Sequence, residues 1–255
     1  MEVYVSQFML FILLFARIVT VIVLAPVLGH QSIPVYFKIA IGLFFSFVMF
    51  PLVSSFNVNI DMKLVAFVML VMREVAVGLL LGFSSGIIFA GIRYAGELIS
   101  FDMGFNISNV FDPETGAQTP VIGELLYLFT TMIFLSINGH HFVIQALQLS
   151  YAAAPIGTWT LNGAFAGKLV NLVGFLFIVG IKFAAPVIIS LFLTNVALAI
   201  LSRIMPQMNI FTVSFPLKIA VGMLVLTSSA PLLVYVFKKL LGQFENDILE
   251  LLQVL

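Results

Sequence analysis

The stretch LVAFVMLVMREVAVGLLLGFSSGIIFA, residues 64–90, carries only two charged side chains, Arg73 and Glu74. As a helix it would be about 40 Å long, which exceeds the roughly 30 Å hydrocarbon core of a bilayer. The stretch therefore predicts a long membrane helix. Neighbouring residues on a helix point in different directions, so Arg73 and Glu74 cannot pair face to face. We expect each of them to meet a partner on another helix or chain.

The same stretch has a small residue at every fourth position, namely Gly78, Gly82, Gly86 and Ala90. Small residues at this spacing share one helix face and let a second helix approach closely. The pattern predicts tight helix packing and carries no information about chemistry. It leaves open whether the neighbouring helix belongs to the same chain.

The composition extends this prediction to the whole chain. Hydrophobic residues make up 62% of the 255 residues and charged residues 9%, whereas soluble domains carry about a quarter charged residues. We therefore expect an all-α integral membrane protein with long, kinked helices and helical hairpins. Eleven acidic residues balance eleven basic ones, which leaves no basic surface for nucleic acid. The absence of cysteine excludes disulfides, thiolate metal sites and cysteine nucleophiles.

Six apolar runs are expected to form the membrane helices: residues 8–28, 34–53, 64–90, 121–154, 169–201 and 217–237. Arg17 lies near the middle of the first run. The Leu, Ile, Phe and Val residues of this run favour insertion by about 4.5–9 kcal/mol, against a cost of about 3 kcal/mol for the arginine. The run should therefore insert, with Arg17 facing protein or water instead of lipid.

The fifth run carries the polar residues Lys182, Ser190, Thr194 and Asn195, and Ser202 follows directly after it. Apart from Asn195, these residues are separated by multiples of four and so share one helix face. Two interpretations remain open, namely hydrogen bonding to neighbouring helices and the lining of a hydrated conduit. In both cases we expect Lys182 to be shielded from lipid.

A polar segment, FDMGFNISNVFDPETGAQTP, occupies residues 101–120 and interrupts the apolar sequence. The window 97–124 holds five of the eleven acidic residues and no basic one. Asp112 precedes a proline, which disfavours helix, and Gly116 permits a positive φ angle, so we expect a shaped loop. The composition allows an ordinary solvated loop at the membrane surface. At membrane depth, the same loop would have to line a water-filled path.

No catalytic, cofactor-binding or metal-binding motif is apparent. The chain has no P-loop, no H-E-x-x-H and no Gly-rich nucleotide fingerprint. His140 and His141 are adjacent, whereas paired metal ligands on a helix are spaced four apart, so we expect them to lie at a turn or helix end. An enzyme is not expected. A stand-alone channel or carrier for small solutes, which would use the intramembrane charges, stays possible at this point.

Three segments carry a family resemblance: MREVAVGLLLGF, GELISFDMGFNISNVFDPETGAQTPVIGELLYL and FLSINGHHFVIQAL. With them the chain resembles, over essentially its whole length, the FliR/SctT family of type III secretion export-gate subunits. Its last third, IKFAAPVIISLFLTNVALAILSRIMPQMNIFTVSFPLKIAV, also looks like FliQ. The resemblance implies a FliP-like region over residues 1–165 and a FliQ-like hairpin and tail over residues 166–255.

The resemblance also implies a function. The chain would assemble with FliP and FliQ, with FlhB and FlhA nearby, around a pore for unfolded flagellar proteins. It would be a multi-pass protein of the bacterial inner membrane in the flagellar basal body, without a cofactor. The segment 106–120 would be the pore plug, with these residues: Asn106, Val110, Phe111, Asp112, Pro113, Glu114, Gly116, Gln118 and Pro120. A subunit of a virulence type III secretion system is the alternative within the same family.

Overall fold

The computed structural model describes residues 2–53, 64–105, 121–158, 163–207 and 209–254. In these ranges the regular structure consists of helices: α1 (Glu2–Leu24), α2 (Val35–Val53), α3 (Leu64–Met103), α5 (Val121–Ser136), α6 (Gly139–Ala153), α7 (Gly163–Ile204) and α8 (Ile210–Val254). Five of them are long and apolar enough to cross a membrane, and the pair α5–α6, bent by 71°, makes up to six. The expected class, an all-α membrane protein of several helices, is confirmed.

The chain forms two compact units that are not continuous in sequence. Unit 1 consists of Met1–Ile87, Phe134–Val173 and Gln243–Leu255, and unit 2 consists of Ile88–Ile133 and Gly174–Gly242. Helices α3, α5, α7 and α8 contribute residues to both units. The division into residues 1–165 and 166–255, which the resemblance implies, stays a prediction.

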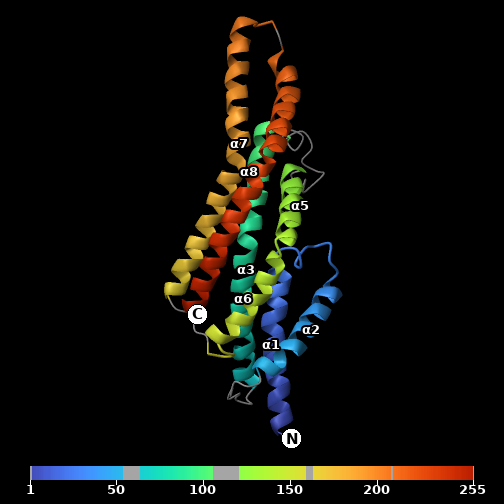
Figure 1. The fold of residues 1–255 in the computed structure, drawn as a ribbon, viewed down its shortest axis with the longest axis vertical. Helices are drawn as coiled ribbons and strands as arrows, with labels where there is room; N and C mark the ends of the chain where they lie inside the picture. Colours follow the sequence, from blue (N-terminus) through green and yellow to red (C-terminus); the bar gives the residue numbers. More distant parts are fainter. Residues whose placement is uncertain (1, 54–63, 106–120, 159–162, 208, 255) are drawn as a thin grey trace. The chain divides into compact units, whose positions relative to one another are not determined.

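Unit 1 contains the antiparallel helices α1 and α2, which pack side by side (Figure 1). The turn between them is tied down by Lys38, whose Nζ donates a hydrogen bond of 2.8 Å to the carbonyl of Gly29. Most of the buried side of α1 is aliphatic, with Leu13, Leu14 and Ile18 fully inaccessible. This apolar face also contains Arg17, so the helix that forms the core of unit 1 brings a charge into it.

Unit 2 combines the second part of α3 with most of α5, α7 and α8. Helices α7 and α8 follow one another through a short connection and turn back into a hairpin (Figure 1). Close contacts at glycines hold α3 in this unit. A Cβ atom on Gly91 would lie 2.7 Å from the carbonyl oxygen of Leu176 on α7. Gly96 packs directly on the backbone of Gly123 on α5.

Helix α3 is longer than the sequence indicated. The apolar run was expected to end near residue 90, and residues 101–120 were expected to be loop, but the helix continues to Met103. Its polar residues are accommodated within unit 2, where Arg93 lies 3.8 Å from a carboxylate oxygen of Glu124 and stacks 4.1 Å from the ring centre of Tyr127. The helix ends where Gly104 adopts a φ of 90°, a conformation that glycine tolerates.

The last connection also differs from expectation. The fifth apolar run was expected to end at residue 201 and the sixth to begin at residue 217, whereas α7 reaches Ile204 and α8 begins at Ile210. Isolated polar residues such as Thr212 and Ser214 interrupt the hydropathy pattern without breaking a helix, because an exposed helix surface accepts them. Beyond Gly242, α8 continues to Val254.

Candidate functional site: a buried ion pair in unit 1

Arg17 and Glu74 form an ion pair in the interior of unit 1. The Nε atom of Arg17 donates a hydrogen bond of 2.7 Å to Oε2 of Glu74, and the side chains are 0% and 1% exposed. Arg17 comes from the middle of α1 and Glu74 from the first part of α3. Each charge thus finds its counter-charge on another helix, and Arg17 is shielded by protein.

The rest of the guanidinium group binds the C-terminal end of α6. One terminal nitrogen of Arg17 donates to the carbonyl and the hydroxyl of Ser150, at 3.1 and 3.3 Å, and the other donates to the carbonyl of Ala154 at 3.0 Å. The carbonyl of Ser150 also accepts a hydrogen bond from the backbone N–H of Ala154, and carbonyls at the C-terminal end of a helix carry partial negative charge. Arg17 therefore caps α6 from a different helix.

Tyr151 completes the contact with α6. Its ring lies 4.4 Å from the guanidinium carbon of Arg17, a cation–π geometry. Its hydroxyl donates to the carbonyl of Leu14 at 3.2 Å. The hydroxyl and the ring thus both bind α1, which fixes α6 against that helix.

The second carboxylate oxygen of Glu74 binds the turn that follows α6. Oε1 accepts a hydrogen bond of 2.9 Å from the backbone N–H of Gly157. Arg73, whose side chain is exposed, donates to the carbonyl of the same glycine at 2.9 Å. The adjacent charges of Arg73 and Glu74 thus hold the two polar groups of one residue, and Gly157 itself has a φ of 79°, which favours glycine.

We call Arg17, Glu74, Ser150, Ala154 and Gly157 the α1–α3–α6 clamp. Its charges are satisfied by each other and by backbone groups, which is the condition under which buried charges are tolerated. Such an arrangement suits a rigid support that joins three parts of the chain. The sequence predicted that Arg17 would be shielded. It could not point to Ser150, Ala154 or Gly157, because backbone carbonyls and N–H groups have no sequence signature.

The predicted glycine ridge lies against α1 over part of its length. A Cβ atom on Gly78 would lie 2.8 Å from the carbonyl oxygen of Arg17, and one on Gly82 would lie 2.6 Å from Cβ of Leu24. A Cβ atom on Gly86 would lie 3.6 Å from its nearest neighbour, which is an ordinary van der Waals contact. The close approach therefore involves the first two glycines and a helix of the same chain. Ala90 is exposed.

The polar side chains of α7 do not form a continuous row of groups that are hydrogen-bonded to one another. Ser190 donates to the carbonyl of Pro186, and Thr194 donates to that of Ser190, both at 2.9 Å. These hydroxyls thus bind the backbone of their own helix, an outcome that the sequence did not anticipate. Lys182 and Asn195 are exposed on this chain. Any shielding of Lys182 from lipid must therefore come from outside the described part of the chain.

The remaining candidate residues are placed as follows. His140 and His141 lie in the first turn of α6, after Asn138, which has a φ of 59°. Among the described residues, no three His, Asp or Glu side chains lie close enough together to hold a metal ion. The predicted plug residues, from Asn106 to Pro120, lie outside the described residues.

Comparison of the sequence with known proteins places the chain in a family. The family "Bacterial export proteins, family 1" matches residues 8–244. The flagellar biosynthetic protein FliR of Bacillus subtilis strain 168 is 35% identical over 228 residues, which cover 87% of this chain and 86% of that protein. FliR of Aquifex aeolicus strain VF5 is 30% identical over 89% of this chain and 88% of its own length. FliR of Escherichia coli K12 is 28% identical over 94% of this chain and 91% of its own length.

Proposed function

Because this chain belongs to the bacterial export proteins of family 1, and within them to the FliR family, we propose that it is a subunit of the flagellar type III protein export gate. In this role it helps to form and to close the pore through which unfolded flagellar proteins leave the cell. The observation that carries the proposal is the match over residues 8–244, which overlaps each of the apolar helices found among the described residues. The chain acts without chemistry of its own.

The α1–α3–α6 clamp supports a structural role. A gate that passes polypeptides must keep its helices packed while the segment that closes the pore moves. The clamp ties α1, α3 and the end of α6 together with buried, fully partnered charges. Breaking such an arrangement leaves a charge unpaired in the interior, which is strongly unfavourable. Unit 1 is therefore suited to stay rigid during export.

The proposed closure is the segment 106–120. Its glycine and prolines favour a defined, non-helical path, and Phe111 supplies a bulky apolar group for a seal. The helices on either side of it, α3 and α5, are packed on each other through Gly96 and Gly123. A loop between anchored helices can move without disturbing their packing. Opening then requires a movement of the loop alone.

The proposed partners are FliP and FliQ, with FlhB and FlhA nearby, in the bacterial inner membrane at the flagellar basal body. Large apolar side chains remain exposed on α2 and α7, among them Phe47 and Phe192, at 77% and 62%. Lipid or other membrane subunits must cover such surfaces. Lys182 is exposed on α7 as well and is better placed against a protein or water than against lipid.

The proposal is tested by deleting the gene in the source bacterium. The deletion strain should be non-motile and should release no flagellar hook or filament proteins, and a plasmid copy should restore both. A tagged chain should co-purify with FliP and FliQ. Normal flagellar export in the deletion strain would overturn the proposal. Loss of secreted virulence proteins instead would assign the chain to the virulence system.

A further inference from the structure

The second part of α3 carries charged side chains on its exposed surface. Arg93 and Glu97 are both exposed and lie four residues apart, so they share one side of the helix. Glu124 of α5 adjoins this side, with a carboxylate oxygen 3.8 Å from Arg93, and the side chains of Arg93 and Glu124 are 47% and 36% exposed. We call Arg93, Glu97 and Glu124 the charged face of unit 2.

Much of the exposed surface around the charged face is apolar. On α5, Leu128 and Met132 are 54% and 73% exposed, and on α7 Phe192 and Leu193 are each 62% exposed. Such side chains suit contact with hydrocarbon or with the apolar surface of another subunit. A charged side chain is strongly disfavoured in the same surroundings. The charged face therefore requires surroundings that differ from those of these apolar residues.

The ion pair of the charged face is formed within the chain but is only partly shielded from solvent. Arg93 has its counter-charge in Glu124 and lies 4.1 Å from the ring centre of Tyr127, so it needs no acidic group from another subunit. Covering the pair with an apolar surface would remove its remaining hydration, which is unfavourable for both ions. Water supplies this hydration. The chemistry of the face thus indicates contact with a water-filled space.

The charged face lies beside the segment that we propose as the closure of the pore. Glu97 lies about 9 Å before the end of α3 at Met103, and Glu124 lies in the first turn of α5. Gly96 and Gly123, each adjacent in sequence to one of these acids, are in direct backbone contact. Both helices that flank the proposed closure therefore present an acidic group close to it.

We propose that the charged face of unit 2 lines the export conduit and is a surface along which the unfolded polypeptide passes. This inference rests on the function proposed above, because it requires a gate with a conduit for polypeptides. Exposed charge pairs contribute little binding energy, and a hydrated wall offers little apolar surface that would retain an unfolded chain. The face is thus suited to contact many different sequences without holding any of them.

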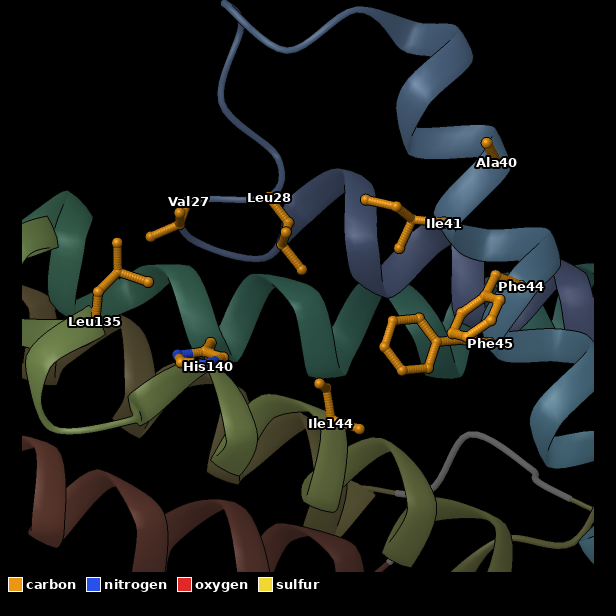
Figure 2. Close-up of a pocket in the computed structure, with 9 residues that line it drawn as sticks. All are labelled: Val27, Leu28, Ala40, Ile41, Phe44, Phe45, Leu135, His140 and Ile144. Atoms are coloured by element: carbon orange, nitrogen blue, oxygen red, sulfur yellow. The ribbon is translucent and has the colours of Figure 1, made fainter.

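A cavity in unit 1 has the opposite character. It has a volume of about 480 Å³ and is bounded by the turn after α1, by α2 and by the bend between α5 and α6. Figure 2 shows Phe44, Phe45 and Ile144 in its walls, and His140 is the one polar side chain among the described residues that line it. A water molecule is held by two to four polar partners, which these side chains do not provide. The cavity is therefore unsuited to a hydrated path.

Cysteine accessibility tests the proposal, because the chain has no cysteine of its own. Glu97→Cys and, as the control on the exposed apolar surface of α7, Phe192→Cys are introduced into the full-length chain, and the gate is purified with its partner subunits. A charged methanethiosulfonate reacts with the thiolate, which forms in water and is disfavoured in apolar surroundings. The cysteine at position 97 should be modified at least about tenfold faster than the one at position 192. Phe101→Cys, one turn further along the same side of α3 and 71% exposed, is the second reporter if replacement of Glu97 prevents assembly.

A stalled export substrate tests the contact itself. A flagellar protein fused to a tightly folded domain stops within the conduit, and photoreactive benzoylphenylalanine at position 97 should then crosslink to it, whereas the same group at position 192 should not. The strains used are those that remain motile, since motility shows that export is intact. Crosslinks from position 97 to a neighbouring subunit and not to the substrate would overturn the inference while leaving the proposed function in place. Equal thiol modification at positions 97 and 192 would overturn it as well.

Discussion

Arg17 sits at the centre of unit 1, in the middle of an apolar helix. A buried charged group in this position is tolerated only if all of its hydrogen-bonding groups have partners. The guanidinium group meets a carboxylate, two backbone carbonyls, a hydroxyl and an aromatic ring. The interaction therefore couples three distant parts of the chain through one side chain. Two changes of single residues test how much of the fold depends on such contacts.

Arg17→Met should strongly destabilise the protein. Glu74 would lose its counter-charge and remain buried, and removal of one member of a buried ion pair costs about 3–5 kcal/mol. The expected result is a marked fall in the melting temperature of the detergent-solubilised protein, or loss of folded protein from the membrane fraction. The matched control is Arg73→Met. That side chain is exposed with one hydrogen bond to Gly157, and its loss should cost about 1 kcal/mol or less. Equal melting of the parent and Arg17→Met would refute the role of the clamp.

Gly78→Ala should force α1 and α3 apart, because the new Cβ would lie 2.8 Å from the carbonyl oxygen of Arg17. We expect a lower melting temperature and a lower yield of folded protein. Gly174→Ala on α7 is the matched control, since a Cβ there meets no atom within 4 Å and alanine favours helix over glycine by about 1 kcal/mol. The two variants should thus change stability in opposite directions. A stable Gly78→Ala variant would show that the contact is loose.

At the level of helices, α3 is held by glycine contacts in each of the two units. Gly78 and Gly82 meet α1 in unit 1, and Gly91 meets α7 in unit 2. Without side chains at these positions, the backbones approach closely, and dispersion contacts replace the hydrophobic driving force that is absent in lipid. Each part of α3 is thereby fixed within its own unit.

Lys182→Leu on α7 should leave the stability of the isolated chain nearly unchanged, because the side chain is exposed. It should reduce flagellar export or the co-purification of partner subunits, because the charge is then expected to meet a partner or water in the assembled gate. Motility on soft agar and pull-down yield measure these effects. Lys182→Arg keeps the charge and is the control. Full motility of Lys182→Leu would mean that the charge has no role in assembly or export.

Deletion of residues 110–116 tests the proposed plug. The assembly should still form, because α3 and α5 are held by contacts outside the deleted segment. The membrane should then leak small ions while no protein is being exported, which a membrane-potential dye detects. Phe111→Ala removes only the bulky apolar group and should leak less than the deletion and more than the parent. Tight membranes in both variants, with the assembly intact, would make this segment an ordinary loop.

At the level of the whole molecule, the chain exposes many large apolar residues on α2 and α7, including Phe47 and Phe192. Some of this surface can face lipid, but a subunit of a larger gate must also share it with neighbours. The purified chain alone should therefore be prone to aggregation.

The chain reconstituted alone in liposomes should neither conduct ions nor transport small solutes, because we propose that the pore is formed together with other subunits. Fluorescent dye release and ion-flux assays measure this. Empty liposomes give the baseline, and liposomes with the co-purified complex whose residues 110–116 have been deleted give the positive control. Flux through the chain alone, above the baseline, would favour the stand-alone channel or carrier.

The membrane class and the apolar runs followed from the sequence, because insertion depends on local composition and on the cost of charges in hydrocarbon. The same cost predicted that Arg17 would be shielded. The glycine spacing in residues 64–90 predicted close packing, since this depends only on residue size and helix period. These are properties of neighbouring residues, which a sequence displays directly.

The tertiary structure alone decided which groups meet. Glu74 is 57 positions from Arg17, and the other partners of Arg17 include carbonyls of Ser150 and Ala154, which every residue type possesses. In the continuation of α3 to Met103, Arg93 meets Glu124 and the ring of Tyr127, both on α5. The cavity beside His140 exists only because two connections and α2 come together. Contacts of this kind depend on how helices pack in space, and that information is not contained in any local stretch of the chain.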